Sequence, residues 1–178
     1  MGQRTIREDV RAAAGGDRVA FGRLYDRWSR AVFLDLVARL RTREDAEDAL
    51  QRTWLDAWRG LPGLADPARF VPWLFRIARN RARDLRRRRT PRLLGEPEEL
   101  IAPESRVHPD SDRVRALVAE LRPDTRAVVL LRAVEGWSAE EVAAARGWSA
   151  STVRRRYARA LRHLRAGLER RASHEIER

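Results

Sequence analysis

Apolar residues recur at three- and four-residue steps along most of this 178-residue chain, and that period predicts α-helices. In the first half the pattern predicts helices over residues 17–40, 42–60 and 70–89. Asp17 and Thr42 suit the N-caps of the first two helices, because their side-chain oxygens can accept hydrogen bonds from the free N–H groups of a first helical turn. Asp66 and Pro67 suit the start of the third helix for the same reason and because proline fits a first turn. The first half is therefore expected to be a helical bundle.

The third predicted helix, Phe70–Arg89, has an apolar stripe on one side and a basic face on the other. The apolar positions that share one face are Phe70, Leu74, Ile77 and Leu85. The positions that face outward are Arg76, Asn80, Arg83 and Arg87. A basic face of this kind suits a nucleic-acid backbone. The alternative is an ordinary solvated helix with a basic end.

The second predicted helix carries acidic residues where its outer face is expected. These outer residues are Glu44, Asp45, Glu47, Asp48, Gln51 and Arg52. Carboxylates in a first turn stabilise a helix by offsetting its dipole, which accounts for some of them. An acidic patch in a basic protein also favours a basic protein partner, and we expect the remaining carboxylates to meet one.

Residues 91–110 differ in character from both halves, with four prolines spaced by six residues and five acidic residues against two arginines. Their low apolar content would not compensate the entropy lost on ordering, so we expect a flexible acidic linker. The flanking segments are basic: residues 1–90 hold 21 arginines against 12 acidic residues, and residues 111–178 hold 15 against 9. The predicted fold is all-α, with two small helical domains at 1–90 and 111–178 joined by this linker.

The second half contains the pattern of a helix-turn-helix motif. Ser138 and Glu141 form a capping box before a short helix, Gly147 permits a tight turn, and Ser149 or Ser151 can cap a longer arginine-rich helix. In this motif the second helix lies in the major groove, with its N-terminal residues at base edges. The expected base-reading residues are Ser151, Thr152, Arg154, Arg155 and Arg159. The alternative is a plain helical hairpin with a solvated basic face.

The amino-acid composition limits the classes of partner and binding site that we expect. The formal net charge is +12 and every basic residue other than histidine is arginine, which favours an anionic partner, nucleic acid ahead of membrane. No cysteine is present, and the three histidines lie far apart, so we expect no metal site, no disulfide and no cofactor. No stretch has the apolar length of a secretory signal or a membrane span. We expect a soluble cytoplasmic protein without membrane insertion.

Two blocks of the sequence resemble one family, the extracytoplasmic-function (ECF) sigma factors of bacterial RNA polymerase, within the sigma-70 family. Residues 21–89 resemble sigma region two through the motifs Phe21-Gly-Arg-Leu-Tyr-Asp, Asp45-Ala-Glu-Asp-Ala-Leu-Gln-Arg-Thr-Trp and Trp73-Leu-Phe-Arg-Ile-Ala-Arg-Asn. Residues 117–164 resemble region four through Gly136-Trp-Ser-Ala-Glu-Glu-Val-Ala and Ser151-Thr-Val-Arg. The order of the blocks across an acidic linker is more specific than either motif alone. The resemblance implies a transcription initiation factor that is not an enzyme by itself.

The resemblance also implies roles for residues of region two. The acidic face matches the family segment that binds the β′ clamp helices of core RNA polymerase, at positions Asp45, Glu47, Asp48 and Gln51. The basic helix and the loop from Leu61 to Arg69 match the segments that hold the promoter minus-ten element, where sigma factors capture a flipped base. The matching positions on the helix are Arg76, Asn80 and Arg83. Trp73 has two interpretations, packing in the core and stacking on a base.

Region four would read the minus-thirty-five element of promoter DNA as a duplex, through the helix that begins near Ser151, and would contact the β flap of the polymerase. Tethering two weak DNA-binding domains to one enzyme raises their effective concentration and sets the spacing between the two elements. Many family members are held by an anti-sigma factor, and the resemblance leaves open whether this chain has one.

Two positions depart from the family pattern. Arg155 stands where serine commonly follows the basic residue of the reading helix, so we expect a shifted promoter preference. Arg146 stands where an aliphatic residue usually precedes Gly147, and we expect a looser turn there. The main alternative is a stand-alone helix-turn-helix regulator, which leaves the acidic face and the acidic linker unexplained. A structural protein with basic helices is the second alternative.

Overall fold

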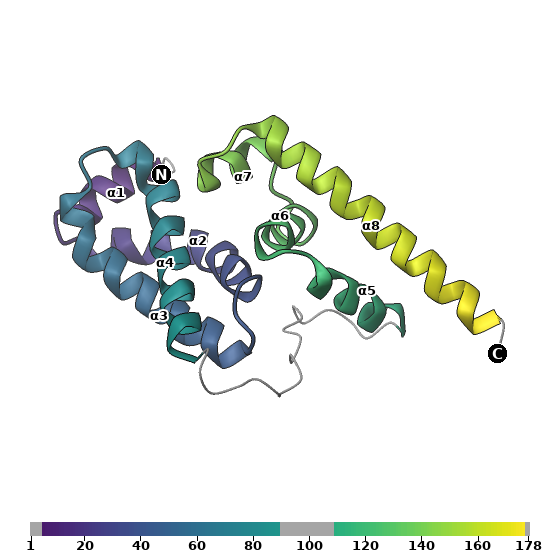
Figure 1. The fold of residues 1–178 in the computed structure, drawn as a ribbon. Helices are drawn as coiled ribbons and strands as arrows, with labels where there is room; N and C mark the ends of the chain where they lie inside the picture. Colours follow the sequence, from purple (N-terminus) through teal and green to yellow (C-terminus); the bar gives the residue numbers. More distant parts are fainter. Residues whose placement is uncertain (1–4, 90–108, 177–178) are drawn as a thin grey trace.

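The structure, a computed structural model, describes residues 5–89 and 109–176, and this part of the chain folds into helices without any strand. Figure 1 shows two groups of helices, α1–α4 and α5–α8. The all-α prediction with two helical domains is confirmed. The predicted linker over 91–110 falls outside the described residues except for its last two positions, which already belong to α5 because that helix begins at Pro109.

The first domain contains four α-helices and two short 3-10 turns. Their bounds are α1 Ile6–Ala14, α2 Arg18–Val37, α3 Arg43–Gly60, η1 Leu61–Gly63, η2 Pro67–Arg69 and α4 Phe70–Arg89. The predicted caps are present: Asp17 accepts hydrogen bonds from two backbone N–H groups of α2, and Thr42 accepts one at 3.1 Å from the backbone of Asp45. Helix α1 was not predicted from the sequence. It begins with a capping box in which Thr5 and Glu8 bond reciprocally.

The apolar stripes of α2, α3 and α4 meet in the core of the first domain. The side chains of Leu24, Leu36, Leu74 and Phe75 are fully buried there, and Trp54 is nearly so. Burying a side chain of this size contributes about 1.5–3 kcal/mol. This core holds α3 and α4 beside each other, so their acidic and basic faces belong to one rigid body.

The second domain has four helices, α5 Pro109–Glu120, α6 Pro123–Ala133, α7 Ala139–Arg146 and α8 Ala150–Ile176. Helix α8 packs against α5, α6 and α7 along its length. Its Gly167 lies so close to Leu117 of α5 that a Cβ atom added to the glycine would come within 2.5 Å of the leucine side chain. The glycine therefore permits the close approach of α5 to α8.

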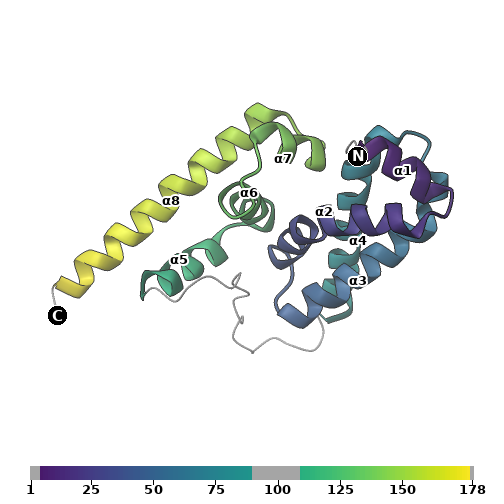
Figure 2. The same cartoon turned by 180° about the vertical axis from the view of Figure 1, so that it is seen from behind.

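The two domains touch through α2 with α6 and through α4 with α7 (Figures 1 and 2). Trp137, in the loop between α6 and α7, packs edge-on against Trp28 of α2 and Phe75 of α4, with ring centroids 5.6 and 5.7 Å apart. An ion pair between Arg30 of α2 and Glu135, which follows α6, also joins the two domains. Buried apolar residues of both domains form one continuous cluster through this contact.

Candidate polymerase and nucleic-acid interfaces

The acidic face of α3 is exposed at three of the four predicted positions. Glu47 and Gln51 are exposed and Asp48 is partly exposed. Each carboxylate has an arginine one turn away on the same helix, with Glu47 bound by Arg43 at 2.8 Å and Asp48 by Arg52 at 2.9 Å. Exposed pairs of this kind contribute only about 0.3–0.5 kcal/mol, so a partner can replace them at little cost.

Asp45 does not belong to this exposed face, and the expectation that it does is wrong. Asp45 is only 5% exposed and lies in the first turn of α3. The physical reason is its phase on the helix. Asp45 lies one turn before Ala49, which is fully buried, and next to Ala46, which is also fully buried. Its backbone N–H donates to the Thr42 cap, so Asp45 belongs to the start of the helix.

Helix α4 presents its predicted basic face as the sequence pattern indicates. Phe70, Leu74 and Ala78 are buried, whereas the predicted minus-ten residues, Arg76, Asn80 and Arg83, are exposed. The Arg83 guanidinium donates a hydrogen bond to the side-chain oxygen of Asn80, which holds these two side chains together. These three residues lie on one helix and are brought together on its outer side.

Trp73 packs inward. Its six-membered ring lies 3.1 Å from the position that a Cβ atom on Gly60 would occupy, and its ring centroid is 6.1 Å from that of Phe70. The side chain is partly buried against the core of the first domain. This geometry favours the core interpretation of Trp73 over the base-stacking one.

The helix-turn-helix geometry is present in α7 and α8. The Ser138 hydroxyl accepts from the backbone of Glu141 at 3.1 Å, and the Glu141 carboxylate accepts from the backbone of Ser138 at 2.7 Å. These bonds from Ser138 lower the pKa of Glu141. Gly147 takes the left-handed conformation with φ of 68°. Ser149 is the cap of α8, because its hydroxyl accepts from the backbone of Thr152 at 3.2 Å.

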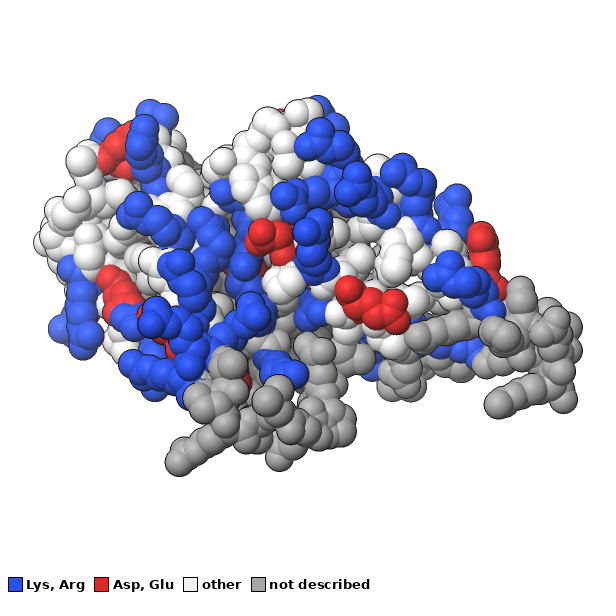
Figure 3. Space-filling model, viewed as in Figure 1, with Lys and Arg blue, Asp and Glu red and all other residues white. Residues whose placement is uncertain are grey.

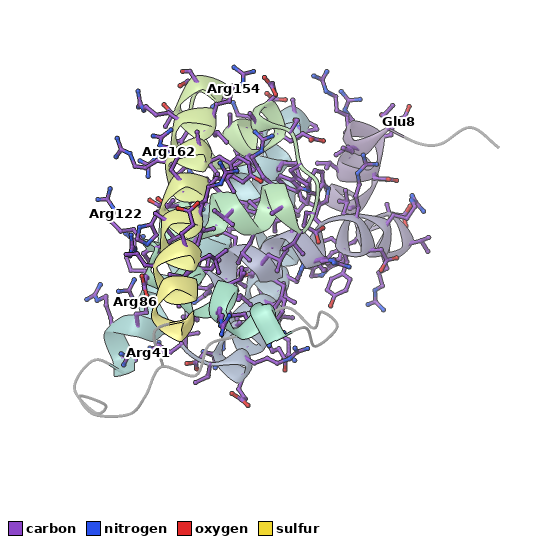
Figure 4. All side chains as sticks on the ribbon, turned by 90° about the vertical axis from the view of Figure 1, so that its right-hand side faces the viewer. Glu8, Arg41, Arg86, Arg122, Arg154 and Arg162 are labelled. Atoms are coloured by element: carbon purple, nitrogen blue, oxygen red, sulfur yellow. The ribbon has the colours of Figure 1, made fainter. Side chains whose placement is uncertain are left out.

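The predicted reading residues gather on the first turns of α8. Four of them, Ser151, Arg154, Arg155 and Arg159, are exposed, and Thr152 is partly exposed. Arg154 pairs with Glu140 of α7 in an exposed ion pair. Figure 4 labels Arg154 near the start of α8. Arg156 points back to its own domain, where its guanidinium stacks 4.6 Å from the ring centroid of Trp148.

Arg146 does not loosen the turn before Gly147, contrary to expectation. Its guanidinium is 1% exposed and binds two carboxylates, Asp35 of α2 in the first domain and Asp124 of α6. Arg39 binds the same two carboxylates, at 3.0 Å to Asp35 and 2.9 Å to Asp124. We call these four residues the interdomain charge cluster. The sequence did not reveal it; the available signals were a lone aspartate in the apolar run 31–38 and an arginine in an aliphatic position.

Burial and charge act in opposite directions on Asp124. Partial burial alone would raise the pKa of its carboxyl, but the Arg39 hydrogen bond and the charge of Arg146 outweigh burial and lower it. On Arg39, burial alone would lower the pKa, but Asp35 and Asp124 outweigh it and raise the pKa. Asp124 and Arg39 therefore both stay ionised near neutral pH.

The basic surfaces of the two domains are distinct. Figure 3 shows arginine side chains gathered over α4 of the first domain and along α8 of the second, with few carboxylates between them. Within the described residues, no group of histidines and carboxylates could hold a metal ion. The helices described are also too short or too polar to cross a membrane. The arrangement offers binding surfaces for one basic protein partner and for nucleic acid at two places.

Comparison with known proteins identifies the family. The family model "Sigma-70 region 2" matches residues 24–92, and "Sigma-70, region 4" matches residues 111–164. This chain is a member of the sigma-70 family. Its relatives place it in the ECF group: it is 35% identical over 169 residues to the ECF RNA polymerase sigma factor SigM of Mycobacterium tuberculosis, covering 89% of this chain and 82% of SigM. The sigma-70 resemblance seen in the sequence is confirmed.

Other relatives agree. The RNA polymerase sigma factor CarQ of Myxococcus xanthus is 37% identical over 156 residues, covering 84% of this chain and 90% of CarQ. Among solved structures, CnrH in complex with the cytosolic domain of CnrY matches with a TM-score of 0.67 and 33% identity, covering 92% of this chain and 96% of CnrH. The protein is therefore a promoter-directing sigma factor. A stand-alone helix-turn-helix regulator is not favoured, because the region two match covers the whole of α3 and α4.

Proposed function

We propose that this sigma factor binds core RNA polymerase through α3, holds the minus-ten element through α4 and reads the minus-thirty-five element through α8. Sigma factors are initiation factors without catalysis of their own, and we assign none to this chain. We propose domain limits of 1–90 and 109–178, with residues 91–108 as the tether between them, because α5 begins at Pro109. The proposed location is the cytoplasm, where the polymerase and the DNA are.

One observation carries the proposal: exposed arginines occur on two separate domains, and the acidic face lies beside one of these basic faces. Glu47, Asp48 and Gln51 are proposed to contact the β′ clamp helices, and Asp45 to hold the start of α3. The carboxylates already pair with arginines along their helix, which supports their ability to exchange these arginines for those of a basic partner. The β flap is the proposed partner of the second domain.

On α4, Asn80 can both donate and accept at a base edge, and Arg76 and Arg83 can hold backbone phosphates as the duplex opens. On α8, the reading residues named above occupy the first turns, where a recognition helix meets base edges. Arg154 is proposed to contact guanine, because its fork can bond O6 and N7 together for about 1–3 kcal/mol of discrimination.

A regulatory protein partner is also proposed. It rests on the solved relative CnrH, which was determined with the cytosolic domain of CnrY, at 33% identity to this chain. When the full-length chain is purified from its native cells and the polymerase is then removed, such a partner should remain bound to the chain.

Run-off transcription tests the function directly. Purified core polymerase with this protein should initiate at one site on a template selected by the reconstituted holoenzyme from a random promoter library, and core alone should not. An Asn80→Ala variant should bind core as the wild type does and initiate less. Failure of the wild-type chain to associate with core would refute the proposal, and equal binding to promoter and random duplex at moderate salt would favour a structural protein instead.

A further inference from the structure

A cleft of roughly 600 Å³ lies between the two domains, beside the interdomain charge cluster. Among the described residues, five arginines of the first domain and one carboxylate of the second domain line it. The lining residues are Arg39, Arg79, Asn80, Ala82, Arg83, Arg86, Arg87 and Asp124. The cleft therefore has a strong excess of positive charge, and most of that charge lies on α4.

Arg79 is the least satisfied cation of this cleft. Its Nη1 atom is buried and has no hydrogen-bond partner among the residues that the structure describes. Burial lowers the pKa of Arg79, and the nearby charges of Arg146 and Arg39 lower it further, against the effect of Asp35. A buried charge without a full set of partners is unfavourable. Such a guanidinium is compensated best by another anion within the cleft.

Asp124 supplies the only negative charge among the described residues that line the cleft. It sits in the first turn of α6 and is held by Arg39 at 2.9 Å and by Arg146. Its side chain remains 45% exposed. Asp124 therefore contributes a single carboxylate to the cleft. It belongs to the second domain, which is proposed to bind the minus-thirty-five element.

The proposed function requires the domains to separate. The minus-ten and minus-thirty-five elements are about 25 base pairs apart, which is about 85 Å at about 3.4 Å per base pair. Domains that pack together through Trp137 cannot occupy both elements at once. Separation withdraws Asp124 from the cleft and leaves Arg39 and Arg79 beside Asn80 and Arg83 without that carboxylate.

We propose that this cleft is an anion site shared by two occupants: the Asp124 carboxylate when the domains are closed, and a backbone phosphate of single-stranded DNA when they are open. Domain closure and DNA binding by α4 then exclude each other, and the second domain inhibits the first. This proposal rests on the proposed function for its DNA partner. Arg39 and Arg79 become phosphate-binding residues in addition to Arg76 and Arg83, the two already assigned to phosphates on α4.

The test measures closure and DNA binding on the full-length chain without polymerase. The chain has no cysteine, so Arg59→Cys on α3 and Arg165→Cys on α8 give two specific positions for a fluorescent donor and acceptor. Titration with a twelve-nucleotide oligothymidine should lower energy transfer as it binds. In the same labelled chain, Asp124→Asn should lower energy transfer in the absence of DNA. It should also bind the oligonucleotide about tenfold more tightly, as expected if about a tenth of the wild-type molecules are open without DNA.

Two further variants make the test specific. Asp26→Asn removes an equally charged, exposed carboxylate of α2 outside the cleft, and it should leave energy transfer unchanged and raise DNA affinity by less than twofold. Arg79→Met should weaken oligonucleotide binding at least threefold while keeping the domains closed. Binding of the oligonucleotide at unchanged energy transfer, or equal affinities for Asp124→Asn and Asp26→Asn, would overturn the proposal. These measurements contain no polymerase, so their result can be interpreted even if the run-off transcription test of the proposed function fails.

Discussion

Reversing one charge on the acidic face of α3 should separate polymerase binding from folding. Asp48 pairs with Arg52 at 2.9 Å, and their side chains are 41% and 46% exposed. Losing an exposed pair one helical turn apart costs about 0.3–0.5 kcal/mol, and placing two arginines there adds a repulsion of similar size. The Asp48→Arg variant should therefore lose less than about 1 kcal/mol of stability. A domain with a typical stability of about 5–15 kcal/mol remains folded after such a loss.

The same change should strongly weaken core polymerase binding. A pair of opposite charges about 4 Å apart interacts by about 4 kcal/mol at an effective dielectric constant of 20, before the cost of removing water. Reversal converts this attraction to repulsion, and salt screens part of it. We expect Asp48→Arg to bind core tenfold to a hundredfold more weakly, equivalent to about 1.4–2.7 kcal/mol.

Fluorescence titration of labelled protein with core polymerase measures this loss, and thermal unfolding measures the loss of stability. Asp26→Arg is the matched control, because it makes the same reversal at an exposed acid of α2. Asp26→Arg should change neither the affinity for core polymerase nor the thermal stability appreciably. A dissociation constant for Asp48→Arg equal to that of the control would refute the assignment of α3 to the polymerase, since the fold would be intact in both.

Three further outcomes are expected. Arg154→Ala should weaken binding to the minus-thirty-five duplex by about 1–3 kcal/mol and leave core binding unchanged, as measured by gel shift and core titration. Ser138→Ala should cost about 0.5–2 kcal/mol of stability through loss of the α7 cap, whereas Ser138→Thr should retain most of it; thermal unfolding measures both. Because Arg39 of the first domain helps to hold the pKa of Asp124 below its ordinary value of about 3.9, closure should be greatest at neutral pH and should decrease as pH falls through that lowered pKa, as energy transfer would report.

Local signals predicted the elements that carry the proposed sites. Phe70–Arg89 is both the predicted helix and the observed α4, because its apolar spacing and the Asp66 start signal are contained within about 25 residues. The capping box at Ser138 and the glycine turn at Gly147 were equally local. Helix α1 carries the same kind of local signal in the capping box of Thr5 and Glu8, so the sequence alone is sufficient to predict that helix.

Asp45 shows where local pattern becomes insufficient. Its position in the first turn of α3 fits a carboxylate that offsets the helix dipole and also fits a residue of the outer face. The sequence pattern is the same in both cases, so it does not distinguish them. The choice depends on where the fully buried Ala46 and Ala49 point, which is set by the packing of α3 on α2 and α4. Tertiary packing therefore decided which carboxylates of α3 remain exposed.

The interdomain charge cluster could not be predicted, because Asp35 and Arg146 are separated by 111 positions and meet only through the arrangement of two domains. Its chemistry also indicates what holds the closed form together. Replacing a whole buried ion pair by apolar residues is often neutral or stabilising, so the complete pair orients an interface more than it tightens it. Removing one partner alone leaves the other charge uncompensated and destabilises the interface. The edge-on packing of Trp137 on Trp28 and Phe75 supplies apolar attraction, whereas the charges fix the register. Because Asp35 and Arg146 regain water when the domains part, the free energy lost on opening is limited, as a reversible contact between two DNA-binding domains requires.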